Sequence, residues 1–376
     1  VRGRRRLARG GGPGGHSGVA RARLAPPRRW SPTKLVACVA TACLAAVLLV
    51  RPVGTSAAEG ESEGTEPACR TPAVADEPPC NPALVDSPWG ASHRGSYAQA
   101  SSAWPGPGPD DEVVARHADV PGVPIQLQFS APYDDGGVAV WGSLVNTDDN
   151  RAVVKVDHDT GALIDAYLPA ERETDPPEAT GSGGISGAYN LLDRDGRFIV
   201  TRERAIEVYE DATPGDRFSP IALVTRFELP DRAFCSADDR LVGMTMTYDG
   251  MVAFATELGT VGVLPREAER MVADEVIAVA LADDDCRAET VPLDERETVS
   301  NSIAVDETGG IYVVTSAAMY RVDWDATVGT LELAWQAAYE TGAAREAIRL
   351  GAGSGSTPSL MGTAADADRF VVITDA

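Results

Sequence analysis

The sequence predicts an all-β fold: a β-propeller of four-stranded blades, preceded by an N-terminal hydrophobic helix. Two observations predict the propeller, a hairpin pattern that recurs at a nearly constant spacing and a near absence of helical periodicity after the N-terminus. A basic segment followed by an uninterrupted apolar one predicts the helix. With 376 residues, the chain is long enough to bury a substantial core.

The recurring unit is a hairpin that opens on a polar residue. In each copy a short strand runs into an Asp/Gly turn and a β-branched strand returns. The leading polar positions, Asn190, Thr245, Asn301 and Thr357, are 55, 56 and 56 residues apart, and an earlier copy covers 134–143. Two more apolar segments usually follow each hairpin, so each unit supplies the four strands of a propeller blade.

The repeat sets the expected blades. Four of them are predicted at about 126–180, 181–233, 234–295 and 296–350, with the start of a fifth before Ala376. An open propeller would leave the edges of its blades unpaired. We therefore expect a truncated form of a ring of six to eight blades, with closure by a partner chain as the alternative.

The N-terminus predicts export. Residues 1–34 hold ten basic side chains and no acidic one, and an apolar run of sixteen residues, 35–50, follows. This pattern, ending in a stretch of small residues, is typical of an export signal. Residues 35–52 are either a cleaved signal or a single-pass membrane anchor, with 1–34 as a basic cytoplasmic leader. In both cases the remaining chain is expected outside the cytoplasm, in the cell envelope or secreted.

The exported part divides into a tether and a body. Residues 53–125 are rich in Pro, Gly, Ser and Glu, and are predicted to be a tether and lead-in that partly docks on the propeller of residues 126–376. Four cysteines lie in this exported part and predict two disulfides, Cys69–Cys80 and Cys235–Cys286. The second would stabilise the fold by about 4 kcal/mol on the chain-entropy model.

Charge excludes one class of partner. From Glu59 onward the chain carries 22 Arg and Lys against 56 Asp and Glu, a net charge of −34. Such a surface repels phosphates, so the body is not expected to bind nucleic acid.

Three segments resemble a known family. Asp157-His-Asp-Thr160-Gly161 is similar to the D-x-x-T-G turn of quinoprotein-like (pyrroloquinoline-quinone-type) propeller repeats, and residues 320–335 resemble that repeat more fully. Trp335 matches the tryptophan that docks between blades in that family, and Ser87–Arg94 resembles its Trp-containing lead-in. The resemblance covers residues 87–376 and implies the fold, with pyrroloquinoline quinone (PQQ) as the cofactor of the enzymes among such proteins.

A second resemblance is to six-bladed lactonase and strictosidine-synthase-like propellers. Residues 301–306 are similar to their strand opening, in which Asn301 would ligate Ca²⁺, and Asn190 holds the same repeat position. Threonine occupies the other two positions, however, and no carboxylate stands there. The favoured interpretation is that these residues hydrogen-bond blade backbone or channel water.

Motifs for catalysis are absent from the sequence. None of the three exported histidines, His93, His117 and His158, is expected beside a plausible nucleophile, and no G-x-S-x-G elbow is present. No C-x-x-C motif indicates zinc or redox chemistry. The Asp-rich turns contain residues that hairpins prefer and lack the twelve-residue calcium-loop pattern. Catalytic residues therefore stay undefined.

The sequence favours a binding or scaffold module of the envelope, acting on a protein, glycan or small molecule. A quinone-dependent oxidoreductase and a calcium-dependent lactonase or esterase are the enzymatic alternatives, and they rest on fold resemblance. The sequence does not decide whether the protein is an enzyme.

Membrane attachment through residues 35–52 is testable by fractionation of expressing cells. A single-pass anchor would keep the full chain in the membrane pellet after a high-salt wash and release it in detergent. Release of the chain by high salt alone would contradict the anchor, and the cleaved-signal alternative would shorten the recovered protein at its N-terminus.

Overall fold

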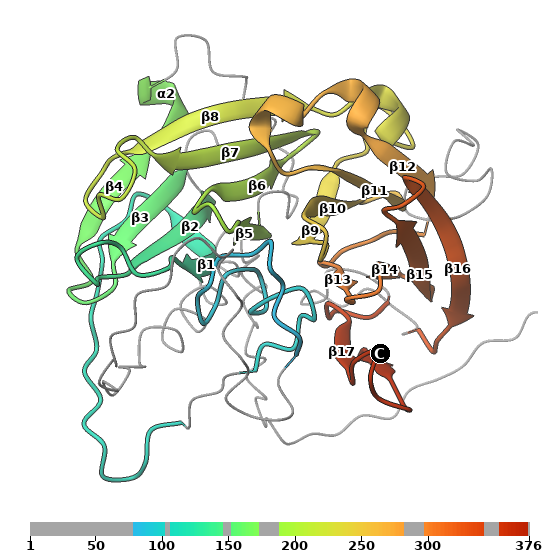
Figure 1. Ribbon diagram of the computed structural model, residues 1–376, viewed down its shortest axis with the longest axis horizontal. Coiled ribbons are helices and arrows are strands. Elements are labelled where there is room, and N and C mark those ends of the chain that lie inside the picture. Colours follow the sequence, from blue (N-terminus) through green and yellow to red (C-terminus); the bar gives the residue numbers. More distant parts are fainter. Residues whose placement is uncertain are drawn as a thin grey trace, which may run out of the picture.

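The computed structural model describes residues 78–101, 106–145, 152–172, 188–281, 297–341 and 353–374. Their regular secondary structure is nearly all β, in four antiparallel sheets of four strands and one sheet of two. The sheets stand side by side around a common centre, with the first strand of each sheet nearest that centre (Figure 1). This arrangement is consistent with the blades of a β-propeller, as the repeat predicts.

Each sheet is a meander in which consecutive strands pair. The first holds β1 (Val123–Phe129), β2 (Ala139–Val145), β3 (Val153–Asp157) and β4 (Leu163–Tyr167). The second holds β5 (Asn190–Leu192), β6 (Phe198–Arg202), β7 (Ala205–Asp211) and β8 (Ile221–Glu228). The third holds β9 (Leu241–Met246), β10 (Met251–Thr256), β11 (Thr260–Pro265) and β12 (Ile277–Ala280).

The last two sheets differ in strand number. The fourth holds β13 (Ala304–Val305), β14 (Gly310–Val314), β15 (Ala318–Asp325) and β16 (Thr330–Ala338), whereas the fifth pairs only β17 (Ser359–Met361) with β18 (Phe370–Val372). Helical structure in the described residues is limited to α2 (Pro169–Arg172) and the 3₁₀ turns η1 (Asp231–Ala233), η2 (Ala268–Arg270) and η3 (Ala273–Glu275). No helix in this part of the chain is long and apolar enough to cross a membrane, and the predicted signal or anchor, 35–52, lies outside it.

The inner strands are apolar on both faces because each sheet packs between two neighbours. In β10, Val252 and Phe254 belong to a core shared with the second sheet. Ala253 and Ala255, which point the opposite way, belong to a core shared with the fourth sheet. Alternation along one strand therefore supplies two cores. Burial of a large side chain such as Phe254 contributes about 1.5–3 kcal/mol to stability.

Charged side chains also cross from one sheet to the next. Arg202 of β6 donates through Nη2 to the carbonyl of Ala152 in the first sheet, at 3.1 Å. Arg266, which follows β11, reaches Asp193 of the second sheet with an Nη1–Oδ2 distance of 2.8 Å. Both arginines are buried, so each needs its partner to offset the free-energy cost of removing the guanidinium from water.

The most buried of these cations is Lys155 of β3. Its ammonium pairs with Asp211 of β7 and lies 5.0 Å and 5.2 Å from the ring centroids of Tyr133 and Trp141. Burial lowers the pKa of Lys155, and burial likewise raises the pKa of Asp211, although each partner's charge opposes that shift. The ion pair thus links the first sheet to the second, at a position where burial of either charge alone would cost free energy.

We expect Asp211→Asn to lower the free energy of unfolding by about 3 kcal/mol, because it leaves the Lys155 ammonium buried without a counter-charge. Urea unfolding followed by circular dichroism measures this change. Asp231→Asn is the matched control, since Asp231 pairs with Arg204 at the surface and its side chain is fully exposed. Equal effects of the two variants would contradict a structural role for the Lys155–Asp211 pair.

Candidate functional site

The centre of the arc is crossed by a segment that precedes the first sheet. Residues 78–101, here called the central strap, lie among the innermost strands (Figure 1, blue). The strap hydrogen-bonds the innermost strand of every sheet, through Trp89 to Phe129 (β1), Gly90 to Leu192 (β5), Ser96 to Met246 (β9) and Val305 (β13), and Tyr97 to Leu360 (β17). It therefore ties all five sheets together at their inner edges.

The strap adopts an unusual backbone to do this. His93, Arg94, Ala98 and Ala100 have φ values of 57°, 84°, 51° and 49°, in the left-handed region that favours glycine. Such conformations cost of order 1 kcal/mol or more each and persist only where surrounding contacts hold them. The hydrogen bonds to the five sheets provide that restraint.

Asn190, at the start of β5, is one of the two residues predicted to ligate calcium. Its Nδ2 donates to Ser143 Oγ at 3.0 Å, and its Oδ1 accepts from Gln128 Nε2 at 2.8 Å. Its backbone exchanges hydrogen bonds with Ser92 of the strap. Calcium requires six to eight oxygen ligands, whereas the oxygen of this amide already accepts a protein hydrogen bond. The arrangement fits a buried hydrogen-bonding hub, and calcium binding at Asn190 stays a prediction.

Asn301, the other predicted calcium ligand, lies just before β13. Its Nδ2 donates to Ser300 Oγ at 3.0 Å and to the carbonyl of Ser354 at 3.3 Å. In the part of the chain that the structure describes, no group of three or more His, Cys, Asp or Glu side chains is placed to hold a metal ion. Calcium binding stays a prediction, while the hydrogen bond to Ser354 matches the favoured interpretation.

His93 lies at the centre, and the sequence assigned it no role. Its Nε2 lies 3.0 Å from Thr357 Oγ1, although the two residues are 264 positions apart. Thr357 Oγ1 also accepts the backbone N–H of Ser302 at 3.2 Å, and the ring of Tyr189 lies 6.1 Å from the imidazole. Burial lowers the pKa of His93, so the neutral imidazole is favoured there. The contact links the strap to the fifth sheet.

A groove opens beside the strap, between the fourth and fifth sheets. Its volume is about 180 Å³, and it is lined by side chains of both sheets and one of the strap: Tyr97, Asp306, Tyr312, Arg321, Trp335, Leu360, Met361, Gly362, Arg369, Phe370 and Val371. At its floor Arg321 donates to Tyr312 Oη at 2.5 Å and lies 3.3 Å from Asp306 Oδ2. Burial would raise the pKa of Asp306, but hydrogen bonds from Thr308 and Gly310 and the charge of Arg321 hold it below its usual value.

The tryptophan that the family resemblance singled out lines this groove. Trp335 of β16 is 39% exposed, and its ring meets that of Tyr312 edge-on at 6.1 Å. A second tryptophan, Trp324 of β15, makes the link to the preceding sheet, where its Nε1 donates to Asp249 at 2.9 Å. Tryptophans thus mark both faces of the fourth sheet.

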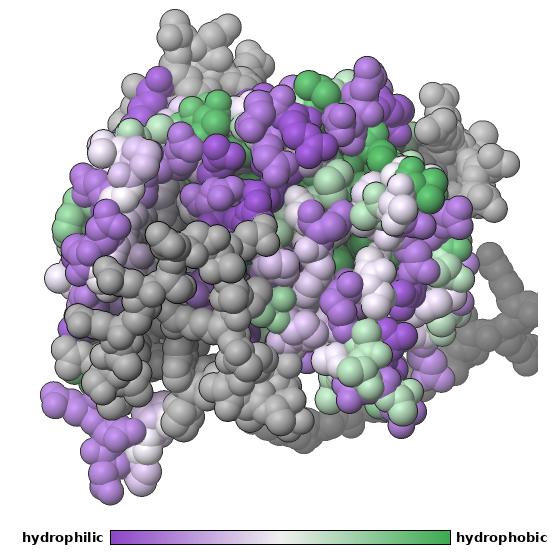
Figure 2. Space-filling model, viewed as in Figure 1, coloured by the Kyte–Doolittle hydropathy of each residue, from purple (hydrophilic) through white to green (hydrophobic). Residues whose placement is uncertain are grey.

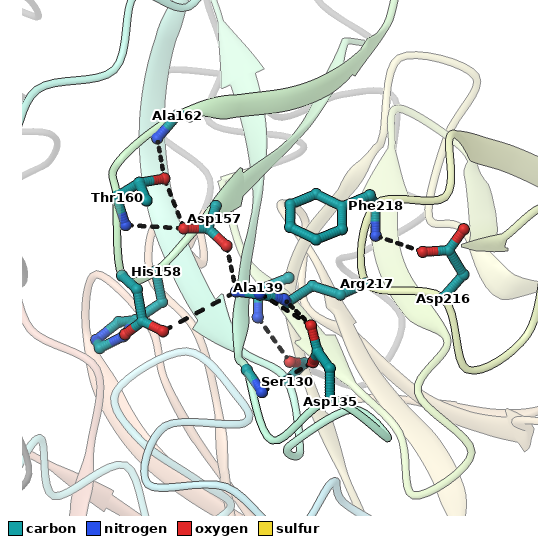
Figure 3. A network of polar contacts seen from close by, with 12 residues as sticks. Ser130, Asp135, Ala139, Asp157, His158, Thr160, Ala162, Asp216, Arg217 and Phe218 are labelled. Carbon is teal, nitrogen blue, oxygen red and sulfur yellow. Dashed lines mark hydrogen bonds and ion pairs between the residues drawn. The ribbon is translucent and has the colours of Figure 1, made fainter.

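The turn that resembles the quinoprotein-type repeat connects the first sheet to the loop between β7 and β8 of the second. Asp157 accepts hydrogen bonds from the backbone and the hydroxyl of Thr160, at 2.8 Å and 2.6 Å. Its other oxygen pairs with Arg217 of the second sheet, which also bonds Asp135 at 3.0 Å (Figure 3). A Cβ at Gly137 would lie 2.2 Å from Arg217 Cζ, so a side chain there would displace the Arg217 guanidinium. These contacts give the turn a structural role, and they do not confirm a quinone site.

The predicted disulfides are not tested by the structure. Cys235 is buried beside Leu258 and Thr260, and Cys80 is the third residue of the strap. The partners assigned to them, Cys69 and Cys286, lie outside the described residues. The pairings therefore stay predictions.

Comparison with known proteins finds one similar protein sequence and does not assign the chain to a family. No protein-family model matches the chain. An uncharacterized protein of Archaeoglobus fulgidus is 42% identical over 302 residues, which cover 80% of this chain and 52% of that protein. The chain thus spans about half the length of this relative.

Solved structures show weak likeness. Sqt1 of Saccharomyces cerevisiae matches with a TM-score of 0.42 at 11% identity, covering 67% of this chain and 57% of that one. A putative 6-phosphogluconolactonase from Bacteroides fragilis matches with a TM-score of 0.35 at 14% identity, covering 58% of each chain. Because these scores are low, the fold assignment rests on the sheets themselves.

We expect the stability of the fold to depend on His93 below neutral pH. Its folded-state pKa lies below the model-peptide value of 6.5, so the unfolded chain binds the proton more readily. The free energy of unfolding should therefore decline as the pH falls below about 6.5, and His93→Gln should remove that part of the decline. Urea unfolding at a series of pH values measures the difference. His117→Gln, at an 82% exposed side chain, is the control, and identical pH profiles for wild type and His93→Gln would contradict the prediction.

Proposed function

We propose that this protein is an exported binding module of the cell envelope, which holds a partner on the outer part of its sheets. The observation that carries the proposal is the contrast between centre and groove. The strap occupies the centre, and polar side chains there have hydrogen-bond partners within the protein, as Asn190 has in Gln128 and Ser143. The groove presents an incompletely covered aromatic side chain, Trp335, above a fixed Arg–Asp pair. Such a combination suits recognition.

Export supports the same role. The basic leader and apolar run of residues 1–50 favour an envelope location, and the strongly acidic body suits a soluble domain that avoids phosphate-bearing partners. The location is a proposal that rests on sequence.

The enzymatic alternatives find less support in the geometry. A lactonase-like centre would need Asn190 as a cation ligand, but that amide is committed to Gln128 and Ser143. In the described residues the strap brings Ser92, His93 and Tyr97 to the centre, which is not the cluster of cations that a polycarboxylate quinone would require. A carboxylate or cation cluster elsewhere in the full protein would revive either alternative.

Purification of the full chain followed by elemental analysis and a redox-cycling quinone stain tests the proposal. We expect folded protein that carries neither calcium nor quinone near one equivalent, and whose thermal midpoint is unchanged by a calcium chelator. One tightly held calcium per chain, with a lower midpoint after chelation, would favour the lactonase alternative. A stoichiometric quinone would favour the oxidoreductase.

A further inference from the structure

The joint between the first and second sheets buries charged side chains within its strands. It is here called the polar seam and is defined by these facing residues: Gln128, Ser143, Lys155, Asn190, Arg202, Glu207 and Asp211. Lys155, Arg202 and Glu207 are 0%, 3% and 0% exposed. Removing an ion from water is unfavourable, and an ion-pair partner offsets that cost only in part. Some of the cost is therefore recovered whenever water enters the seam.

The polar seam also contains an unpaired acceptor. Gln128 Nε2 donates to Asn190 Oδ1 at 2.8 Å, and Asn190 Nδ2 donates to Ser143 Oγ at 3.0 Å, so hydrogen bonds cross the seam. Gln128 Oε1, however, is buried and receives no hydrogen bond from the part of the chain that the structure describes. A buried acceptor without a donor is unfavourable, and water would satisfy it if the two sheets separated.

The next two joints are built from apolar side chains. The core between the second and third sheets includes Leu191, Ile199, Ile206, Val208, Met244, Met246, Val252, Phe254 and Leu264. The core between the third and fourth sheets includes Val242, Ala253, Ala255, Val261, Val263, Ile303, Val305, Ile311 and Val313. The buried pair of Arg266 and Asp193 lies outside the strands, in the turns that follow β11 and β5. Separation of these sheets would expose apolar surface to water, so we expect the polar seam to open before them.

The strap holds the inner end of the polar seam. Phe129 N of β1 donates to Trp89 O at 2.9 Å. Leu192 N of β5 donates to the next strap residue, at Gly90 O, over 2.7 Å. Two consecutive residues thus fix the inner strands of both sheets, whereas the charges of the seam lie further out, on β3, β6 and β7. A movement of one sheet against the other would therefore pivot at the strap and separate the outer strands.

Polar contacts also close the outer end of the seam. On β4, Asp165 Oδ2 accepts the backbone N–H of Ile221 of β8 at 2.8 Å, and Arg172 Nη1 donates to the Ile221 carbonyl at 3.0 Å. The side chains of Asp211 and Arg226 are 13% and 19% exposed. Hydrophilic residues predominate on the surface where Figure 1 places β7 (Figure 2). Water is thus available at the outer end to replace these contacts.

We propose that the polar seam is a hinge, at which the first sheet swings away from the second while the second, third and fourth sheets stay packed. The closed form is the stable one, because apolar rings stack across the seam, as Trp141 and Phe198 do with centroids 5.9 Å apart. In the open form water reaches Lys155 and Asp211, and their ion pair forms again on closing. The hinge is a property of the fold and is independent of the binding role proposed above.

Hydrogen–deuterium exchange of the full chain, followed by mass spectrometry of its peptides, measures how often each sheet opens. The strands β2 and β3 are compared with β10 and β11, which are likewise the two middle strands of a four-stranded sheet. We expect the amides of β2 and β3 to exchange at least about tenfold faster, because the hinge exposes them without unfolding the third sheet. Equal exchange in the two sheets would overturn the hinge.

Variants assign the opening to the seam. Lys155→Met/Asp211→Asn removes both charges and keeps an oxygen for the Tyr133 hydroxyl, which donates to Asp211 at 2.8 Å. We expect exchange of β2 and β3 to slow by about tenfold, because opening no longer hydrates buried charges. Ile206→Val, in the core between the second and third sheets, is the matched control and should speed exchange of β10 and β11 alone. All these forms share the opposite face of the first sheet, so unchanged exchange of β2 and β3 in the double variant would contradict the proposal.

Acetylation of Lys155 measures the same opening with the wild-type seam, so the test holds if the double variant fails to fold. Lys34 is the only other lysine of the chain, and the buried Lys155 amine meets sulfosuccinimidyl acetate only when the seam opens. The amine introduced by Arg270→Lys, at a 55% exposed position, gives the reference rate. We expect the opening equilibrium constant from Lys155 to equal the one from exchange of β2 and β3. A constant as small as that of β10 and β11 would mean that only unfolding of the whole chain exposes Lys155, and would overturn the hinge.

Discussion

The fold depends on the contact between the central strap and the inner edges of the sheets. A sheet whose first strand faces the centre of an arc has unpaired backbone groups on that side, and these need partners once water is excluded. On β5 the strap supplies them directly, since Leu192 N donates to Gly90 O at 2.7 Å and Val85 N donates to Leu192 O at 3.1 Å. A segment outside the repeat thus completes the hydrogen bonding of the repeat.

The same contact involves two of the polar residues that recur in the repeat, Asn190 and Thr357. A repeat of apolar strands alone would not require Asn190 or Thr357, yet both lie where the strap passes and both bond to it. The side chains are small enough to stand between backbones and carry both donors and acceptors. Asn301, at the third repeat position, instead bonds Ser300 and Ser354.

The sequence predicts the sheets better than the site. Hairpin turns with Asp and Gly, followed by β-branched residues, are local signals, and the strands β5–β6, β9–β10 and β13–β14 form where the repeat placed them. The strap is different, because Ser87–Arg94 carries no periodic signal that would say which strands it meets. The pairs His93–Thr357 and Lys155–Asp211 join residues 264 and 56 positions apart, and sequence alone does not show such contacts. Lys155 does stand out in composition, since only one other lysine occurs in the chain.

The strap and the groove are physically linked through Tyr97. Its backbone carbonyl accepts the N–H of Leu360, its ring lines the groove, and its hydroxyl donates to Glu307. Glu307 in turn accepts the backbone N–H of Ala364, in the turn between β17 and β18. A ligand in the groove would therefore contact the residue that anchors the strap and the turn that positions β18. Because the strap also holds the other four sheets, the stability of the centre and the shape of the groove depend on the same few hydrogen bonds.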